Sequence, residues 1–277
     1  MSRKREIPVF GSPLLETHCH LDYLQDEALV QTLAAAQAVG VERIITIAVS
    51  PGNLDTVRQL AETHVMVWGT QGIHPHDARD YSDAVQAQIR ANAQTERMVA
   101  IGEIGLDYYY DHSDRTCQRE VFERQLQLAI ELDLPIVVHT RDADADTEAI
   151  LRNFMPGMRQ RGVIHSFTSG MALAEYCLGE GFHLGFNGIS TFNRADNVRE
   201  VIAMTPLEQI LFETDSPYLT PVPYRGKPNA PCYLPFIAEK VAEVKQVALE
   251  SLLPQVWDNS LRLFFPAEAA GGGRAAV

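Results

Sequence analysis

Two histidines separated by one residue stand at the end of the first apolar run of the chain. In the segment LLETHCHLD, His18 and His20 are two positions apart, so on a strand both side chains point to one side and Cys19 to the other. Neutral imidazole is a ready ligand for zinc, manganese or iron, which makes a metal site one interpretation. The other is a pair of hydrogen-bonded histidines, which an isolated H-x-H motif favours.

An acidic side chain interrupts another apolar run, MVAIGEIGLDYYY. Glu103 lies there between Gly102 and Gly105, and a carboxylate buried without a cation is costly. A metal ion would remove this cost, and so would a salt bridge, for which Arg141 is a candidate partner. Asp107, on the following loop, is placed to orient a ligand histidine through its second ring nitrogen.

Further histidines and acids follow three later apolar runs, LPIVVHTRDAD, GVIHSFTSG and QILFETDSPYL. In the last run Glu213 and Asp215 are two positions apart, which predicts that both acids face one side. Polar residues at corresponding positions of so many runs favour a metal centre over separate structural roles. Its predicted ligands are His18, His20, Glu103, His139, His165 and Asp215. They suffice for two divalent cations (Mg, Mn or Zn), with Glu103 as the bridge and Asp215 as ligand and general base.

The segment GIHPHDA adds two histidines at the start of a loop marked by Gly72 and Pro75. His74 is predicted to contact a substrate or to brace the site. His76 is predicted to cap the loop.

These side chains meet only if the strands that carry them converge. Short apolar runs predict strands over 14–19, 44–49, 65–71, 98–104, 134–139, 162–167, 183–187 and 210–214. Helical patterns cover 26–39, 53–63, 81–93, 116–132, 144–154, 171–179, 195–204 and 233–247. Eight strand-then-helix units predict a single TIM-like (β/α)8 barrel over 1–266, with catalysis at the carboxyl ends of its strands. A doubly wound open sheet is the alternative, and the Ala/Gly-rich tail 267–277 is expected to be disordered.

The composition limits the classes of function. The chain has 277 residues, 46% of them apolar and 21% charged, as in ordinary globular proteins. It shows neither a membrane span nor a signal peptide, so we expect a cytoplasmic protein with no membrane partner. We also expect a monomer. Its formal net charge of -13, from 23 basic and 36 acidic residues, argues against tight non-specific binding of duplex DNA.

Eight motifs follow one another along residues 14–265: ETHCHLD, GIHPHDA, IGEIGLDYYYDHS, LPIVVHTRDADADT, GVIHSFTSG, GFNGISTF, ETDSPYLTPVPYRGKPN and NSLRLF. In this order they resemble the TatD-type metal-dependent deoxyribonucleases of the amidohydrolase superfamily. The resemblance implies a distorted (β/α)8 barrel, one or two divalent cations and hydrolysis of phosphodiester bonds in DNA. It implies that His18, His20 and Asp215 bind the first ion. It also implies that His139 and His165 bind the second ion, and that Glu103 bridges the two.

Two positions depart from the pattern of this family. Ala230 stands where members often have glutamate after GKPN, and Asn193 where they often have lysine near STF. Neither is a predicted ligand, so the departures bear on how substrate is held. Arg225 and Lys227, together with Arg141, are candidates to hold a phosphate, and the alternative for them is a solvated loop.

The leading hypothesis is a 3′-5′ exonuclease that acts on single-stranded or frayed DNA ends. Aromatic residues near the mouth are candidates to stack on bases: Tyr108, Phe167, Phe192 and Tyr218. The same residues would also serve a metal-dependent esterase or amidase, such as a D-aminoacyl-tRNA deacylase. A non-catalytic binding module is a third hypothesis, which no feature of the sequence favours.

Overall fold

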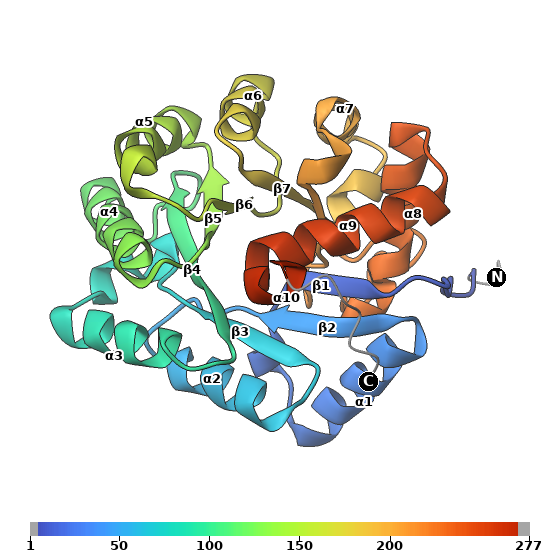
Figure 1. Ribbon diagram of the computed structural model, residues 1–277, viewed down its shortest axis with the longest axis horizontal. Coiled ribbons are helices and arrows are strands. Elements are labelled where there is room, and N and C mark those ends of the chain that lie inside the picture. Colours follow the sequence, from blue (N-terminus) through green and yellow to red (C-terminus); the bar gives the residue numbers. More distant parts are fainter. Residues whose placement is uncertain (1–4, 271–277) are drawn as a thin grey trace.

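Eight parallel strands form one sheet in the computed structural model, which describes residues 5–270 (Figure 1). Their bounds are β1 (Leu14–Cys19), β2 (Val41–Thr46), β3 (Val67–Gln71), β4 (Met98–Asp107), β5 (Ile136–Arg141), β6 (Gly162–Ile164), β7 (His183–Phe186) and β8 (Ile210–Phe212). Each strand pairs with the next one in the chain, from β1 through to β8. This order confirms the predicted TIM-like barrel, because a doubly wound sheet would reverse its strand order at a switch point.

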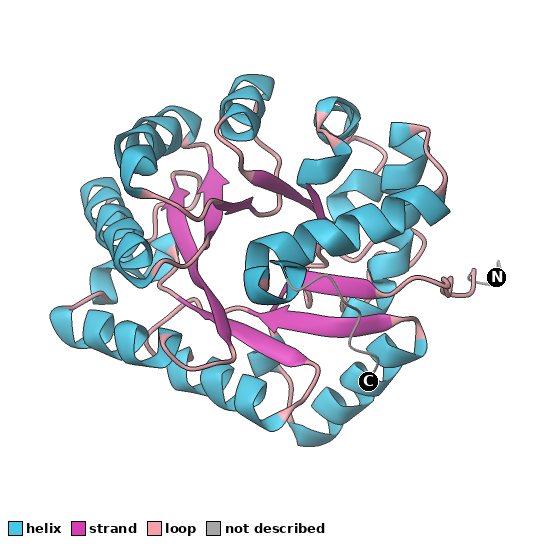
Figure 2. Ribbon diagram, in the orientation of Figure 1, coloured by secondary structure: helices cyan, strands magenta, loops and turns pink. Residues whose placement is uncertain are grey.

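Helices connect the strands and surround the sheet (Figure 2). Their bounds are α1 (Asp26–Ala38), α2 (Leu54–Thr63), α3 (Asp83–Ala93), α4 (Arg115–Leu132), α5 (Asp144–Phe154), α6 (Met171–Gly179), α7 (Asp196–Met204), α8 (Leu234–Lys245), α9 (Leu249–Phe264) and α10 (Pro266–Ala270). Among these helices, all within residues 5–270, none is both long enough and apolar enough to cross a membrane.

The chain after residue 247 differs from the predicted pattern. No element was predicted there, yet α9 extends from Leu249 to Phe264 with Pro254 inside it, a residue that normally signals the end of a helix. Burial of one side of α9 against the barrel outweighs this local signal. Residues 267–270 of the tail expected to be disordered belong to α10, and 271–277 lie outside the described residues.

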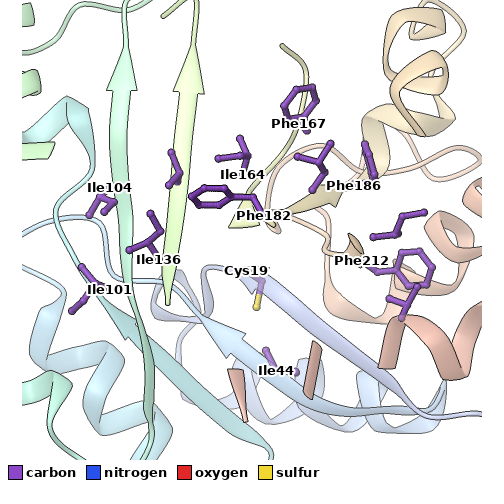
Figure 3. Packing of buried hydrophobic residues seen from close by; sticks show 14 of the residues in the cluster. Cys19, Ile44, Ile101, Ile104, Ile136, Ile164, Phe167, Phe182, Phe186 and Phe212 are labelled. Carbon is purple, nitrogen blue, oxygen red and sulfur yellow. The ribbon is translucent and has the colours of Figure 1, made fainter. Parts of the chain in front are cut away.

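Two hydrophobic clusters use alternate residues of the strands, because successive side chains point to opposite faces of a sheet. Ile44 and Ile164 belong to the outer cluster, where strands meet helices such as α4 through Phe122; Figure 3 shows part of this cluster. Their neighbours Ile45 and Val163 belong to the inner cluster, which fills the barrel. The sequence alternation therefore places one apolar layer inside the sheet and one outside it.

Helix α9 lies across the amino-terminal end of the barrel (Figure 1). Leu263, Phe264 and Phe265, at its end, complete the inner cluster. The Asn259 side-chain amide donates hydrogen bonds to the carbonyls of Leu207 and Ile210, at 2.7 and 2.9 Å, and so ties α9 to the start of β8. This end of the barrel is therefore closed by apolar side chains.

The barrel closes between β8 and β1 without a regular ladder. A single parallel bridge joins Cys19 to Ser216, and two backbone hydrogen bonds flank it. The amide of Asp215 donates to the carbonyl of His18 at 2.9 Å, and the amide of His20 donates to the carbonyl of Ser216 at 2.8 Å. We call this junction the seam. Three predicted metal ligands lie directly on it.

Candidate metal centre

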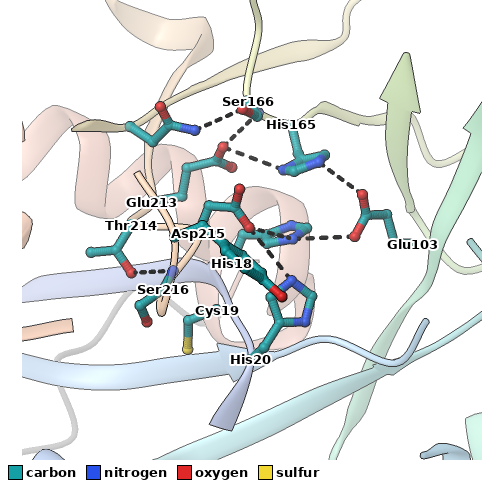
Figure 4. A network of polar contacts seen from close by, with 12 residues as sticks. His18, Cys19, His20, Glu103, His165, Ser166, Glu213, Thr214, Asp215 and Ser216 are labelled. Carbon is teal, nitrogen blue, oxygen red and sulfur yellow. Dashed lines mark hydrogen bonds and ion pairs between the residues drawn. The ribbon is translucent and has the colours of Figure 1, made fainter. Parts of the chain in front are cut away.

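The carboxyl end of the barrel gathers the predicted ligands into one polar cluster. Figure 4 shows this cluster with the ligands other than His139 labelled. One group consists of His18, His20 and Asp215, which we call the seam triad. A second group consists of Glu103, His139 and His165, which we call the central triad. Potential ligand atoms of the seam triad lie within 4.8 Å of one another, and His18, Glu103 and His165 meet the same limit across the two triads.

A bulge in β1 sets the orientation of the two histidines of the H-x-H motif. Leu15 faces the inner cluster, and strict alternation would turn Thr17 the same way. The register with β2 shifts between Glu16 and Cys19, and Cys19 instead packs in the outer cluster. His18 and His20 therefore both face the site, as the spacing predicted, but an irregular strand brings them there.

A second bulge places the acid in the centre of the site. Gly102 pairs with Val137 and Ile104 with Val138, so Glu103 is an extra residue of β4 that bends out of the ladder. Gly105 follows with φ at 140°, and a Cβ there would lie 1.9 Å from the carbonyl oxygen of His139. Only glycine fits at this approach between β4 and β5.

The two carboxylate oxygens of Glu103 face different triads. Oε2 lies 3.4 Å from His18 Nε2, on the side of the seam triad. Oε1 lies 3.1 Å from His139 Nδ1 and 2.9 Å from His165 Nε2. A carboxylate whose two oxygens face two different groups of potential ligands has the geometry of a bridging ligand.

The distances within the cluster fit donor atoms that surround cations. Donor atoms about 2.1 Å from one ion lie about 3.0 to 3.4 Å apart at octahedral or tetrahedral angles. Asp215 Oδ1 lies 3.5 Å from His20 Nε2 and 3.7 Å from His18 Nε2, close to this range. Both ring nitrogens of His18 and Nδ1 of His20 are buried without a hydrogen-bond partner among residues 5–270. Buried polar atoms without partners are rare, and a cation would satisfy those that face it.

The charges of the cluster are mutually dependent. Burial alone would raise the pKa of Glu103, but the charge of the His165 imidazole holds it well below the usual range. Burial disfavours a charged imidazole, yet Glu103 and Glu213 raise the pKa of His165 well above the value of free histidine. In the absence of metal, protons on the histidines therefore balance the charge of the ionised carboxylates, and cations would displace those protons on binding.

Acidic side chains behind the central triad orient its histidines. Asp107 Oδ2 lies 3.1 Å from His139 Nε2, so Asp107 can accept a hydrogen bond from Nε2–H while Nδ1 faces Glu103, where a cation would use its lone pair. Asp107 also lies 3.0 Å from His76 Nε2, which is a further contact for a residue predicted only to cap its loop. The predicted orienting role of Asp107 is thus matched by its position.

Glu213 contacts His165 on the ring nitrogen that faces away from Glu103. It is fully buried, with Oε1 3.5 Å from His165 Nδ1 and accepting a hydrogen bond from the Ser166 amide at 2.5 Å. Asp215 joins the seam triad. β8 ends at Phe212, before either acid, and Asp215 has a left-handed backbone with φ at 55°. Both acids nonetheless contact histidines of the metal centre, so they share one side as the spacing predicted, although the strand has ended before them.

His74 also reaches the centre, with Nε2 3.4 Å from Glu103 Oε1, and with Glu103 and His139 it forms a third group of potential ligands. Its Nδ1, however, accepts a hydrogen bond from the amide of His76 at 3.1 Å. Burial lowers the pKa of His74 well below 6.5, so the ring is neutral and carries its proton on Nε2. A protonated nitrogen donates a hydrogen bond and has no lone pair for a metal.

The basic residues predicted to hold phosphate lie apart from the ligands. The Arg141 guanidinium lies over the ring of Tyr109, 4.0 Å from its centroid, so the contacts of Glu103 are histidines and the alternative salt bridge does not form. Arg225 lies 3.7 Å from the ring centroid of Phe192 and lines a surface cavity of about 430 Å³. The Lys227 ammonium is 5.8 Å from the ring of Tyr224.

Only one of the four predicted stacking residues is widely exposed. Tyr218 is 52% exposed, but Phe167 is buried, the hydroxyl of the partly buried Tyr108 donates to Asp146 at 2.6 Å, and Phe192 lies under Arg225. Three tyrosines that were not predicted to stack are also exposed: Tyr23, Tyr109 and Tyr110. Tyr23 lies three positions after His20, and that proximity to the H-x-H motif was the available signal.

Fold and site together define a TIM barrel of the metallo-hydrolase type. The family model described as TatD related DNase matches residues 15–265, and the chain belongs to this family. The uncharacterized metal-dependent hydrolase YcfH of Escherichia coli (strain K12) is 41% identical over 256 residues, covering 91% of this chain and 95% of YcfH.

Two further relatives extend the comparison. A Pantoea sp. (strain At-9b) protein named 3′-5′ ssDNA/RNA exonuclease TatD is 36% identical over 240 residues, covering 84% of this chain and 92% of that protein. The crystal structure of YjjV, a TatD homolog from Escherichia coli K12, matches with a TM-score of 0.86 and 29% identity, covering 91% of this chain and 97% of YjjV. The resemblance seen in the motifs is thereby confirmed.

Proposed function

We propose that the protein is a metal-dependent phosphodiesterase that removes nucleotides from the 3′ end of single-stranded or frayed DNA. The observation that carries the proposal is the division of the Glu103 oxygens between two groups of potential metal ligands. The name of the Pantoea relative, a 3′-5′ ssDNA/RNA exonuclease, supports the choice of substrate and polarity.

The seam triad would hold one divalent cation and His139 with His165 the other, with Glu103 as their bridge. When bound, such cations stabilise charge on a phosphoryl group and lower the pKa of water, and Mg²⁺, Mn²⁺ and Zn²⁺ all suit this donor set in part. Two divalent cations would add four positive charges at the place where the scissile phosphate would bind. The net charge of -13 therefore limits how DNA is held but is compatible with a DNA substrate.

Asp215 is the residue of the cluster best placed to accept a proton from the attacking water. Its side chain is 15% exposed, whereas that of Glu103 is 4% exposed. Burial opposes its ionisation, but a hydrogen bond from His20 lowers the pKa of Asp215, so it is an ionised acceptor at neutral pH. It combines the roles of ligand and general base.

Residues around the triads would position the substrate. The Nε2–H of His74 points into the centre and can donate to a phosphoryl oxygen as readily as to Glu103. Arg141, Arg225 and Lys227 would contact neighbouring phosphates of the strand, with charge-assisted hydrogen bonds. Arg141 ends β5, and Arg225 and Lys227 lie on the loop after β8. Because none of the three is a predicted ligand, they are expected to change KM more than kcat.

The test is hydrolysis of a 5′-labelled single-stranded oligonucleotide by metal-loaded protein, compared with the same strand blocked at its 3′ end. We expect stepwise shortening of the free strand only, and loss of at least about a hundredfold in kcat for Asp215→Asn. The control Glu62→Gln changes an exposed acid on α2 that pairs with Arg58 at 2.8 Å and should keep full activity. Shortening of the 3′-blocked strand, or turnover of an aminoacyl-tRNA but not of DNA, would overturn the proposal.

A further inference from the structure

A cluster of three aromatic rings stands at the rim of the metal centre. The Tyr23 ring stacks on His20 with centroids 5.5 Å apart and planes at 28°. Tyr218 meets Tyr23 edge to face at 6.2 Å and meets His20 at 6.3 Å. His20 belongs to the seam triad, so the two tyrosines lie one ring away from a candidate metal ligand. We call Tyr23 and Tyr218 the tyrosine pair.

The tyrosine pair is open to solvent although its rings are large and mostly apolar. Tyr23 is 48% exposed and Tyr218 52% exposed. The other exposed tyrosines differ, because the Arg141 guanidinium lies over Tyr109 and the His112 ring stacks on Tyr110. The tyrosine pair contacts His20, which is a candidate metal ligand. Within residues 5–270, no Arg or Lys side chain lies over either ring of the pair.

The backbone that carries Tyr218 is held in place by hydrogen bonds. The amide of Tyr218 donates to the carbonyl of Asp215 at 2.9 Å, and its own carbonyl accepts from the Asn229 side chain at 2.6 Å. Asn229 also donates to the carbonyl of Thr214 at 2.9 Å, which joins the loop to the end of β8. Tyrosine has few rotatable bonds, so rings on a fixed backbone lose little entropy when they bind a flat ligand.

We propose that the tyrosine pair is a stacking subsite for the base of the nucleotide next to the scissile phosphate, an inference that rests on the proposed phosphodiesterase function. A phosphate between the two triads lies beside His20, and the base of the attached nucleotide is the nearest flat apolar group of such a substrate. Base stacking on aromatic side chains tolerates every sequence, since all bases have a π-face. The subsite therefore selects single-stranded or frayed ends, whose bases are free to leave the helix, without reading their sequence.

The test compares two oligonucleotides, one with a terminal 2-aminopurine and one with an abasic terminal residue, on the full metal-loaded chain. Tyr218→Leu should raise KM about tenfold for the first substrate and less than about twofold for the abasic one. Tyr218→Phe keeps the ring and should behave as wild type on both. Quenching of 2-aminopurine fluorescence should accompany binding to wild type and to Tyr218→Phe, and should be lost in Tyr218→Leu.

The outcomes separate the subsite from the proposed function. If wild type quenches the fluorescence through Tyr218 but cleaves neither strand, the phosphodiesterase proposal fails and the stacking subsite stands. If wild type cleaves and Tyr218→Leu raises KM equally for both substrates, the subsite is refuted and the phosphodiesterase stands. Equal metal content and equal thermal midpoints of the variants ensure that neither result comes from misfolding.

Discussion

The two ends of the barrel use the same eight strands for opposite purposes. At the amino-terminal end, Phe264 and Phe265 of α9 fill the opening, and Trp68 packs against Phe265 with ring centroids 5.2 Å apart. At the carboxyl end, some polar atoms of buried imidazoles and carboxylates have no hydrogen-bond partner in the described part of the chain; both ring nitrogens of His18 are examples. One end contributes stability through apolar burial, and the other keeps polar groups in place for ligands.

The pKa values of His183, at the amino-terminal end, and His139, at the carboxyl end, are shifted in opposite directions. At the amino-terminal end, burial and the nearby Arg262 lower the pKa of His183 to about 4, so its ring is neutral. At the carboxyl end, burial acts in the same direction on His139, but Asp107 and Glu103 raise its pKa. Burial of an imidazole alone therefore does not define the site, and the carboxylates around it make the difference.

The largest expected effect belongs to the bridging position at the carboxyl end. Glu103→Gln keeps the size of the side chain but removes the charge shared by the two triads, so we expect hydrolysis to fall at least about a thousandfold. Elemental analysis of the purified variant should show fewer ions per chain than wild type. Wild-type activity in Glu103→Gln would show that the two triads do not act as one centre.

At the amino-terminal end the corresponding change should act on stability alone. Phe264 is 4% exposed, so Phe264→Ala should lower the free energy of unfolding in urea by about 3 to 5 kcal/mol. The exposed control Val65→Ala should change it by less than about 0.5 kcal/mol. If the folded Phe264→Ala variant lost bound metal, the two ends of the barrel would not have the separate roles in stability and in metal binding that we assign to them.

The lowered pKa of His183 should make the free energy of unfolding depend on pH. His183 has a folded pKa of about 4, below the 6.5 of an unfolded chain, so the unfolded state takes up a proton first as the pH falls. Its contribution to stability is complete above pH 6.5 and is lost towards pH 4, by up to about 3 kcal/mol. Urea unfolding of wild type and His183→Gln from pH 7 to 4 should converge by about that amount. Parallel curves would refute the shift.

A smaller effect is expected behind the central triad. Asp107 is 1% exposed and fixes the ring of His139, so Asp107→Asn should weaken metal binding about 10- to 100-fold. Calorimetric titration should show this loss in one of two binding events, because the seam triad does not contact Asp107. The exposed control Asp83→Asn, whose side chain is 97% exposed, should bind as wild type does. A loss shared by both events would place Asp107 outside this role.

The spacing of residues along the chain predicted most strands and helices because a barrel repeats one strand-then-helix unit. Alternating apolar runs indicated the strands, and the histidines at the ends of β1, β5 and β6 indicated the site. Two features depended on contacts far apart in the sequence. Helix α9 forms against the barrel end despite Pro254, and Glu213 contacts His165, which joins the ends of β8 and β6. The tyrosine pair joins Tyr23 to Tyr218 across the seam, which no local pattern contains.

The most direct test of the central claim is anomalous X-ray scattering from crystals of the protein loaded with Mn²⁺ or Zn²⁺. We expect two peaks about 3.5 to 4 Å apart, one beside His18, His20 and Asp215 and the other beside His139 and His165. The carboxylate of Glu103 should lie between them, with one oxygen toward each. A single peak, or two peaks that Glu103 does not join, would contradict the account.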